Sequence, residues 1–154
     1  MKILKLIFVL ALTLGVVSLG FTAEAKRIAT ITELKGVVEV KVPKQPWIPA
    51  SVGMLLNQGD LIRTKAKSSA ILNLDAAAQT ATVEVKEGSQ LALAELLEDK
   101  ATATQTTLLD LALGEILIKA KKLHSEKSRF EVKTPTSIVG VRGTKFSVTV
   151  KAIE

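Results

Sequence analysis

The chain has 154 residues, 21 Lys and Arg against 15 Asp and Glu, a formal net charge of +6, and neither cysteine nor tyrosine. The missing cysteines exclude disulfides and a thiolate zinc site, and this length suits one domain. One tryptophan and four phenylalanines leave the core to aliphatic residues and give little aromatic surface for stacking on nucleic acid.

The N-terminal 25 residues have the pattern of a secretory signal peptide. Lys2 and Lys5 precede an almost wholly apolar run, Leu6–Gly20, and small residues follow at Ala23 and Ala25. We expect cleavage after Ala25, so that residues 1–25 are a signal peptide, residues 26–154 form the domain, and the protein is periplasmic or secreted. The alternative is a retained anchor, although the run is shorter than the ~20 residues of a spanning helix.

Period-2 alternation of apolar residues predicts half-buried strands throughout residues 26–154. The alternating segments are Val38–Val42, Ala70–Leu74, Val83–Val85, Leu109–Leu113 continuing to Ile118, and Phe130–Val132. Leu91–Lys100 has helical propensity, yet Leu91 and Leu93 alternate, so we expect a strand that ends in a turn near Glu98–Lys100. The predicted fold is all-β, a twisted β-sandwich or a solenoid-like β-roll of about eight to twelve short strands.

A glycine recurs between apolar segments at intervals of 23, 29 and 26 residues, at Gly36, Gly59, Gly88 and Gly114. Such spacing fits paired hairpins in a sandwich as well as successive coils of a solenoid, and glycine turns of any all-β fold would produce it too. The recurrence therefore leaves the architecture open between these alternatives.

Trp47 lies in a loop with three prolines, Pro43, Pro46 and Pro49, which cannot be a central strand. We expect Trp47 to pack over an open end of the core. The alternative is an exposed aromatic anchor for a partner or glycan.

Positive charge is concentrated near the C-terminus, where nine basic residues lie between Lys119 and Lys151 against Glu126 and Glu131. A basic surface attracts anionic lipid, glycan or nucleic acid, and predicted export argues against nucleic acid. The candidate face for an anionic partner consists of Lys119, Lys121, Lys122, Lys127 and Arg129. The alternative is a solvated loop that keeps the protein soluble.

The segment Thr134–Phe146 combines a Thr-Pro entry, two glycines and a following strand. Gly140 and Gly143 permit positive φ or close backbone approach, and Arg142 between them either fixes the bend from a partly buried position or faces outward toward an anion. Alternation then places Phe146, Val148 and Val150 on one face, and it places the polar residues on the other. That polar face consists of Lys145, Ser147, Thr149 and Lys151.

This segment resembles the Thr-Pro…Val-Arg-Gly-Thr-x-Phe-x-Val signature of the FecR domain family. The signature residues here are Thr134, Pro135, Gly140, Val141, Arg142, Gly143, Thr144 and Phe146. The resemblance implies a periplasmic β-rich domain, known from transmembrane regulators of iron-uptake signalling, and a structural role for these residues. Because five residues precede the apolar run, we expect no anti-sigma region and a stand-alone exported FecR domain.

The sequence offers little catalytic chemistry. His124 is the one histidine and lies in a charged segment, and Glu95, Glu98 and Asp99 lack a calcium-loop pattern. We therefore expect no enzyme activity, no cofactor and no metal. The predicted function is a non-enzymatic binding or scaffolding module of the cell envelope, with an unknown envelope protein or anionic glycan or lipid as partner. Self-association through the C-terminal edge strand is a further expectation, and the alternative function is a sensor subunit that relays an envelope signal to a separate membrane protein.

Overall fold

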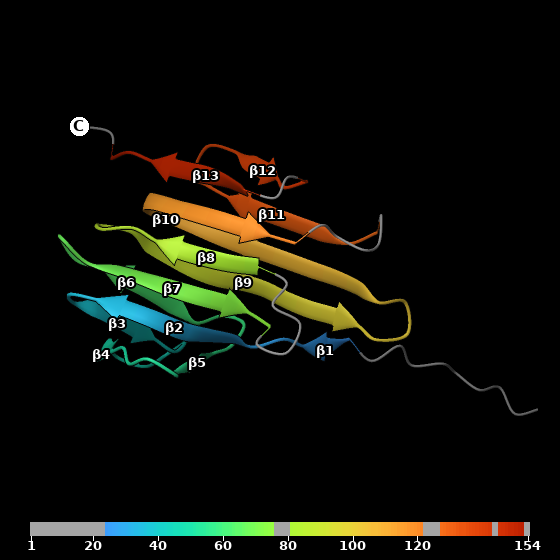
Figure 1. The fold of residues 1–154 in the computed structure, drawn as a ribbon, viewed down its shortest axis with the longest axis horizontal. Helices are drawn as coiled ribbons and strands as arrows, with labels where there is room; N and C mark the ends of the chain where they lie inside the picture. The colour runs from blue at the N-terminus through green and yellow to red at the C-terminus, as the bar shows by residue number, and fades with distance from the viewer. Residues whose placement is uncertain (1–23, 76–80, 122–126, 143–144, 153–154) are drawn as a thin grey trace, which may run out of the picture.

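The computed structural model describes residues 24–75, 81–121, 127–142 and 145–152, and in these ranges it is all-β (Figure 1). They contain no helix, and hence none long and apolar enough to cross a membrane. The strands are β1 Ala25–Lys26, β2 Ala29–Lys35, β3 Val38–Lys41, β4 Ile48–Pro49, β5 Leu55–Leu56, β6 Leu61–Thr64, β7 Ser69–Leu74, β8 Ala81–Val85, β9 Gln90–Asp99, β10 Thr104–Ala120, β11 Arg129–Lys133, β12 Ile138–Gly140 and β13 Lys145–Val150. The predicted signal peptide lies outside the described residues except for Glu24 and Ala25, and the proposed cleavage point falls inside β1.

The strands form one curled sheet that folds into two layers, a half-barrel with the core between them. One layer, sheet A, has the order β4-β3-β6-β9-β10-β11-β12, with β1 beside β9. The other layer, sheet B, has the order β5-β2-β7-β8-β10-β13. Strand β10 belongs to both, because its first half pairs with β9 and β11 and its second half pairs with β8 and β13.

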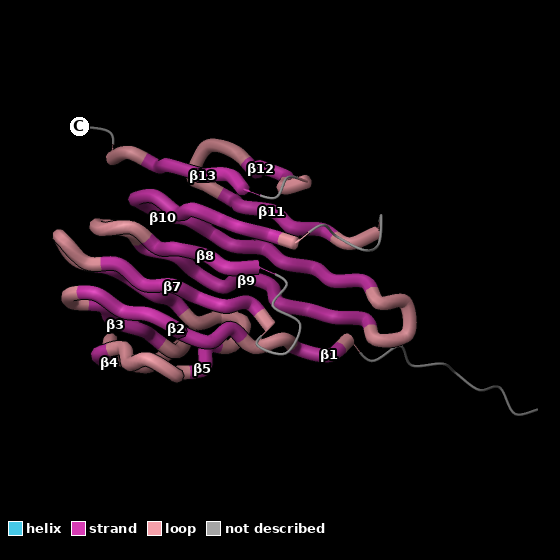
Figure 2. Tube along the Cα trace, viewed as in Figure 1, coloured by secondary structure: helices cyan, strands magenta, loops and turns pink. Residues whose placement is uncertain are grey.

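This architecture lies between the two expected alternatives. The layers face each other as in a sandwich, yet the chain crosses between them four times at the same end, as in a roll (Figure 2). Two features go beyond the predicted all-β fold. Strand β10 is 17 residues long, and β10 and β11 pair in parallel, whereas the other pairings of the described strands are antiparallel.

Positive-φ glycines shape three of the four crossings. Gly36 joins β2 to β3 at φ 70°, Gly88 lies between β8 and β9 at φ 63°, and Gly114 bends β10 at φ 94°. The crossing from β6 to β7 instead uses Lys67 at φ 54°. The fourth recurring glycine, Gly59 at φ 94°, lies between β5 of sheet B and β6 of sheet A, so all four members of the glycine recurrence lie at a change of layer.

The four crossings are joined side by side by buried hydroxyl groups, and we call this row the crossing seam (Gly36, Thr64, Ser68, Ser89, Gly114). Ser68 Oγ accepts a hydrogen bond from the Val37 amide at 2.9 Å. Thr64 Oγ1 donates to the Lys86 carbonyl and accepts from the Ser89 amide. Ser89 Oγ accepts from the Glu115 amide at 2.9 Å. The seam thus satisfies backbone groups that the change of direction removes from the sheet ladders.

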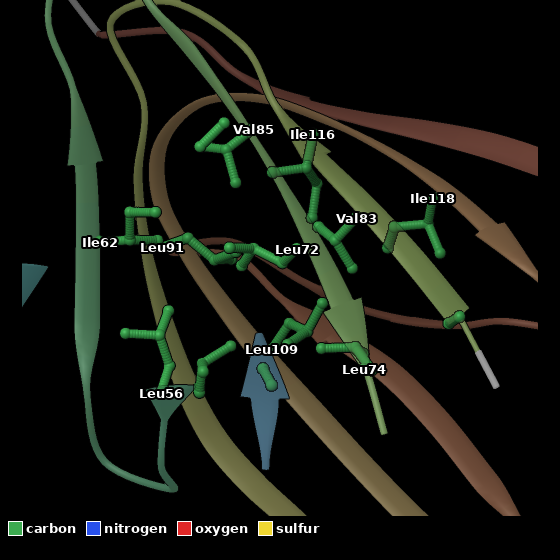
Figure 3. Packing of buried hydrophobic residues seen from close by; sticks show 14 of the residues in the cluster. Leu56, Ile62, Leu72, Leu74, Val83, Val85, Leu91, Leu109, Ile116 and Ile118 are labelled. Atoms are coloured by element: carbon green, nitrogen blue, oxygen red, sulfur yellow. The ribbon is translucent and has the colours of Figure 1, made fainter. Parts of the chain in front are cut away.

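The core is the aliphatic inner face of both layers. Strands β7 and β8 alternate strictly between buried and half-buried residues, as expected for strands with one face on a core. Figure 3 shows Leu72 and Leu74 of β7 and Val83 of β8 packed with Leu91 and Leu109 of the opposite layer. The predicted aliphatic core is confirmed.

The hairpin between β9 and β10 confirms the strand and turn expected near residues 91–100. Strand β9 ends at Asp99, whose Oδ1 accepts hydrogen bonds from the amides of Ala101 and Thr102. These bonds close the turn, and the hydrogen bond with Thr102 is the main cause that lowers the pKa of Asp99.

Substitution of Gly114 tests the seam. A Cβ at Gly114 would lie less than 3.0 Å from the backbone of Ser89, and φ is unfavourable for an L-residue, so Gly114→Ala should cost at least about 3 kcal/mol of unfolding free energy. Gly88→Ala is the matched control, because its φ is also positive but its Cβ meets nothing within 4 Å, and it should cost about 1 kcal/mol. Urea unfolding of both variants measures the difference, and equal losses would contradict the steric role of Gly114.

Candidate binding site at the open side

The two long sides of the half-barrel differ in how their edge strands end. On one side the edges are β4 and β5, two residues each, and β4 includes Pro49, which has no N–H to donate. On the other side, within the described residues, β12 pairs only with β11, and β13 pairs only with β10 (Figure 1). We call this the open side. A six-residue edge such as β13 presents a row of backbone groups that another strand can pair with.

The Thr-Pro entry of the signature builds a tight turn between β11 and β12. The Thr134 amide donates to the Ser137 carbonyl at 2.8 Å, and Thr134 Oγ1 accepts from the Ser137 amide at 3.0 Å. Pro135 occupies the second position of this four-residue turn, where its fixed φ is favourable. This geometry accounts for Thr134 and Pro135 as structural residues, and it holds β12 at the edge of sheet A.

A groove of about 670 Å³ runs between this turn and the end of β13. Its lining residues are Ala112, Leu113, Thr134–Ser137, Val139 and Ser147–Ala152. Leu113 is 40% exposed and Val139 is 39% exposed, so two large apolar side chains of the groove remain accessible to solvent. Ile138 beside them is 64% exposed. Apolar surface next to unpaired strand edges is typical of a binding site.

Strand β13 has the two faces expected from its alternation. Val148 is buried, and Phe146 is half-buried with its ring 6.5 Å from that of Phe130 in an edge-to-face arrangement. The outward residues Lys145, Ser147 and Thr149 are exposed, as is Lys151 after the strand. The inner face therefore anchors β13, while its outer side chains are exposed and its second edge is unpaired within the part of the chain that the structure describes.

The structure describes two of the signature residues whose roles the sequence left open. Gly140 has no positive φ, and a Cβ there would meet nothing within 4 Å, so neither reason for glycine applies. Arg142 is exposed, as in the second alternative, while Val141 beside it is buried and donates its amide to the Phe130 carbonyl. Successive side chains of an extended segment point to opposite faces, so a buried Val141 is compatible with an exposed Arg142. Gly143 and Thr144 lie outside the described residues.

The structure does not bring the predicted basic residues to one face. By alternation, Lys119 lies on the outer face of sheet B, opposite Lys145 in the ladder, whereas Arg129 lies on the outer face of sheet A. Lys127 lines a small depression that also contains Glu24 and Asp99. Lys121 is exposed just beyond β10, and Lys122, like His124, lies outside the described residues.

The sequence predicted that Trp47 covers an open end of the core, and the structure places it elsewhere. It lies on the sheet beside β3 and β6, where the Arg63 guanidinium carbon is 4.0 Å from its ring centroid and Lys41 Nζ is 6.0 Å away. Arg63 also donates to Glu39 at 2.7 Å, and Lys65 is 3.5 Å from the same carboxylate. These cations occupy the ring face that an anchor would offer to a ligand, so this arrangement supports the structural interpretation.

Taken together, the described residues form an all-β domain with a groove beside the edge strands β12 and β13. The family model described as "FecR protein" matches residues 60–153, more than half of the chain, and the protein therefore belongs to the FecR family. FecR domains are sensor-type domains of envelope signalling, typically periplasmic, and the family is a regulatory one. The matched range includes the groove and both free edges. Searches of curated proteins and of solved structures give no match.

The hydroxyl of Thr134 provides a test of the turn. Thr134→Val keeps the shape but removes the group that bonds the Ser137 amide, so we expect a loss of about 1 kcal/mol in unfolding free energy. Thr136→Val is the matched control, since Thr136 is exposed in the same turn, and its effect should be within about 0.5 kcal/mol. Equal effects of the two substitutions in urea unfolding would rule out the role of the Thr134 hydroxyl.

Glu39 provides a test by pH. The hydrogen bond from Arg63 is the main cause that lowers the pKa of Glu39 below its ordinary value of 4.5. A lowered folded-state pKa stabilises the fold above pH 4.5, and this stabilisation disappears as pH falls through the folded value. Glu39→Gln should therefore lower the thermal midpoint at pH 7, and the difference from wild type should shrink below pH 4.5. Glu33→Gln, at an exposed carboxylate, is the control, and a difference for Glu39→Gln that stays constant with pH would contradict the assignment.

Proposed function

We propose that this protein is a non-enzymatic binding or scaffolding module of the cell envelope, and that it holds its partner at the open side of the half-barrel. The observation that carries the proposal is the groove between β12 and β13, where accessible apolar side chains lie beside two strand edges that are unpaired among the described residues. Membership in a regulatory family supports a binding role.

The hydrogen bonds and packing of the groove walls also support binding. One wall is the hydrogen-bonded turn Thr134–Ser137, and the other is β13, which is anchored through Val148 and Phe146. Leu113 of the groove lies next to Gly114 of the crossing seam, so the fold fixes its position. A site on rigid elements loses little conformational entropy when a partner binds.

A second candidate is a sensor subunit that relays an envelope signal to a separate membrane protein. The family match favours it, because FecR domains are sensor-type domains. The two candidates use the same surface and differ in the partner. A scaffold keeps its partner regardless of condition, whereas a sensor exchanges a membrane partner when the signal changes.

Site-specific crosslinking in intact cells tests the proposed surface. A photoreactive p-benzoylphenylalanine at Val139 should give a crosslink to one defined protein, and Leu113→Lys should reduce it at least about fivefold by placing a charge in the groove. The same probe at Val52 is the matched control, because Val52 is 61% exposed and outside the groove. Equal yields from Val139 and Val52, or a yield insensitive to Leu113→Lys, would refute the open side as the working surface.

A further inference from the structure

The outward face of β13 carries positive charge at both of its ends. Lys145 lies at its start and Lys151 follows its last residue, with Ser147 and Thr149 between them, and all four are exposed. Their alternation places both lysines on the same face of the sheet. A strand that added to β13 would place its own outward side chains beside these lysines.

The neighbouring strand makes this charge stronger. Lys119 of β10 is the direct ladder partner of Lys145, and Lys119 is exposed as well. Like charges directly opposite each other destabilise an antiparallel pair, and opposite charges stabilise it. A carboxylate next to Lys145 would therefore offset a repulsion that the fold contains.

The inward face of the same edge is apolar. Val148 and Val150 of β13 line the groove together with Leu113 and Val139, and the polar residues Ser147, Thr149 and Lys151 of β13 line it as well. An added strand would need apolar side chains beside Val148 and Val150, and carboxylates beside Lys145 and Lys151. Because side chains alternate along a strand, a single segment that alternates apolar and acidic residues meets both requirements.

We propose that the partner segment is an extended polypeptide of alternating apolar and acidic residues, which adds to β13 as a new edge strand of sheet B. This proposal rests on the proposed function, and it specifies the chemistry of the partner at that site. The segment hydrogen-bonds through its backbone to the free edge of β13. Its apolar side chains fill the groove, and its carboxylates face Lys145 and Lys151.

A second copy of this chain fits the edge poorly. If β13 of two copies paired antiparallel with full overlap and with both Val148 side chains inward, Lys145 of each copy would lie opposite Lys151 of the other. Two such lysine pairs are unfavourable. A glycan or a lipid surface could neutralise the lysines, but neither supplies the backbone donors and acceptors that a free strand edge requires.

Synthetic peptides test the pattern. Fluorescence anisotropy measures the binding of three fluorescein-labelled nine-residue peptides to the domain of residues 26–154. One alternates valine with glutamate, one alternates valine with lysine, and one has the valines and glutamates of the first in two separate blocks. We expect the alternating glutamate peptide to bind at least about tenfold more tightly than either of the others. Equal binding of the alternating and block glutamate peptides would overturn the proposal, because charge alone would then suffice.

Charge reversal provides the decisive control. The double variant Lys145→Glu and Lys151→Glu should reverse the preference, so that the lysine peptide binds more tightly than the glutamate peptide. The matched variant Lys44→Glu and Lys100→Glu makes the same change in net charge at exposed lysines away from the groove, and it should keep the wild-type preference. Circular dichroism confirms that both variants are folded. An unchanged preference in the first variant, or a reversal in the second, would overturn the assignment.

The other occupants give distinct outcomes. Binding to phosphatidylglycerol vesicles or to alginate that survives Val139→Lys would show a lipid or glycan partner instead. A dimer in sedimentation that is abolished by Val139→Lys would show a second copy at the edge. If the alternating peptide fails to bind while the crosslink from Val139 persists, the partner chemistry is wrong and the proposed function stands. If that crosslink is absent, the proposed function itself fails.

Discussion

The bend of β10 at Gly114, where the backbone packs closely against Ser89, positions the two layers of the sheet relative to each other. Without it, β10 could not belong to both layers, and the sheet would not close on the side of β8 and β9. Ser89 Oγ holds the amide of Glu115 at the bend, and Thr64 holds Ser89 in turn. Since each crossing bonds to the next, an altered bend would disturb the neighbouring layer changes as well.

The same constraint creates the open side. Once β10 has turned into sheet B, β11 can pair with its first half and β13 with its second half, on opposite layers. The two final edges, β12 and β13, then lie in different layers and do not pair with each other among the described strands. The groove is the space between them, so its position follows from the bend and from the turn at Thr134–Ser137.

The fold determines which contacts the basic C-terminal residues and Trp47 make, and composition alone does not show this. The basic C-terminal region is divided over two faces, and Lys145 and Lys151 gain importance because they share one face of a free strand. The single tryptophan lies against Arg63, which is also bound to Glu39. Both features would look like ligand sites in the sequence, and in the fold the Trp47 ring is already in contact with Arg63.

Residue patterns alone predict the strictly alternating strands, the aliphatic core, the polar outer face of β13 and the family. These follow from local rules, since the period of two and the Thr-Pro turn act within a few residues. The sequence did not determine that Leu109–Ile118 forms part of one bent strand, that β11 pairs in parallel, or that Arg142 is exposed. The two-residue strands β4 and β5 were also beyond local rules, because they have too few residues for a periodic signal.

The long-range packing of the fold selects which edges stay unpaired among the described strands and which apolar residues line the groove together. Leu113 and Val139 are 26 positions apart in the sequence, and their neighbourhood depends on the bend, the parallel pairing and the turn together. Strand partners are chosen by long-range packing that no single segment encodes. The family signature thus identified the domain, and the strand pairing located the groove between β12 and β13 that we propose as its binding surface.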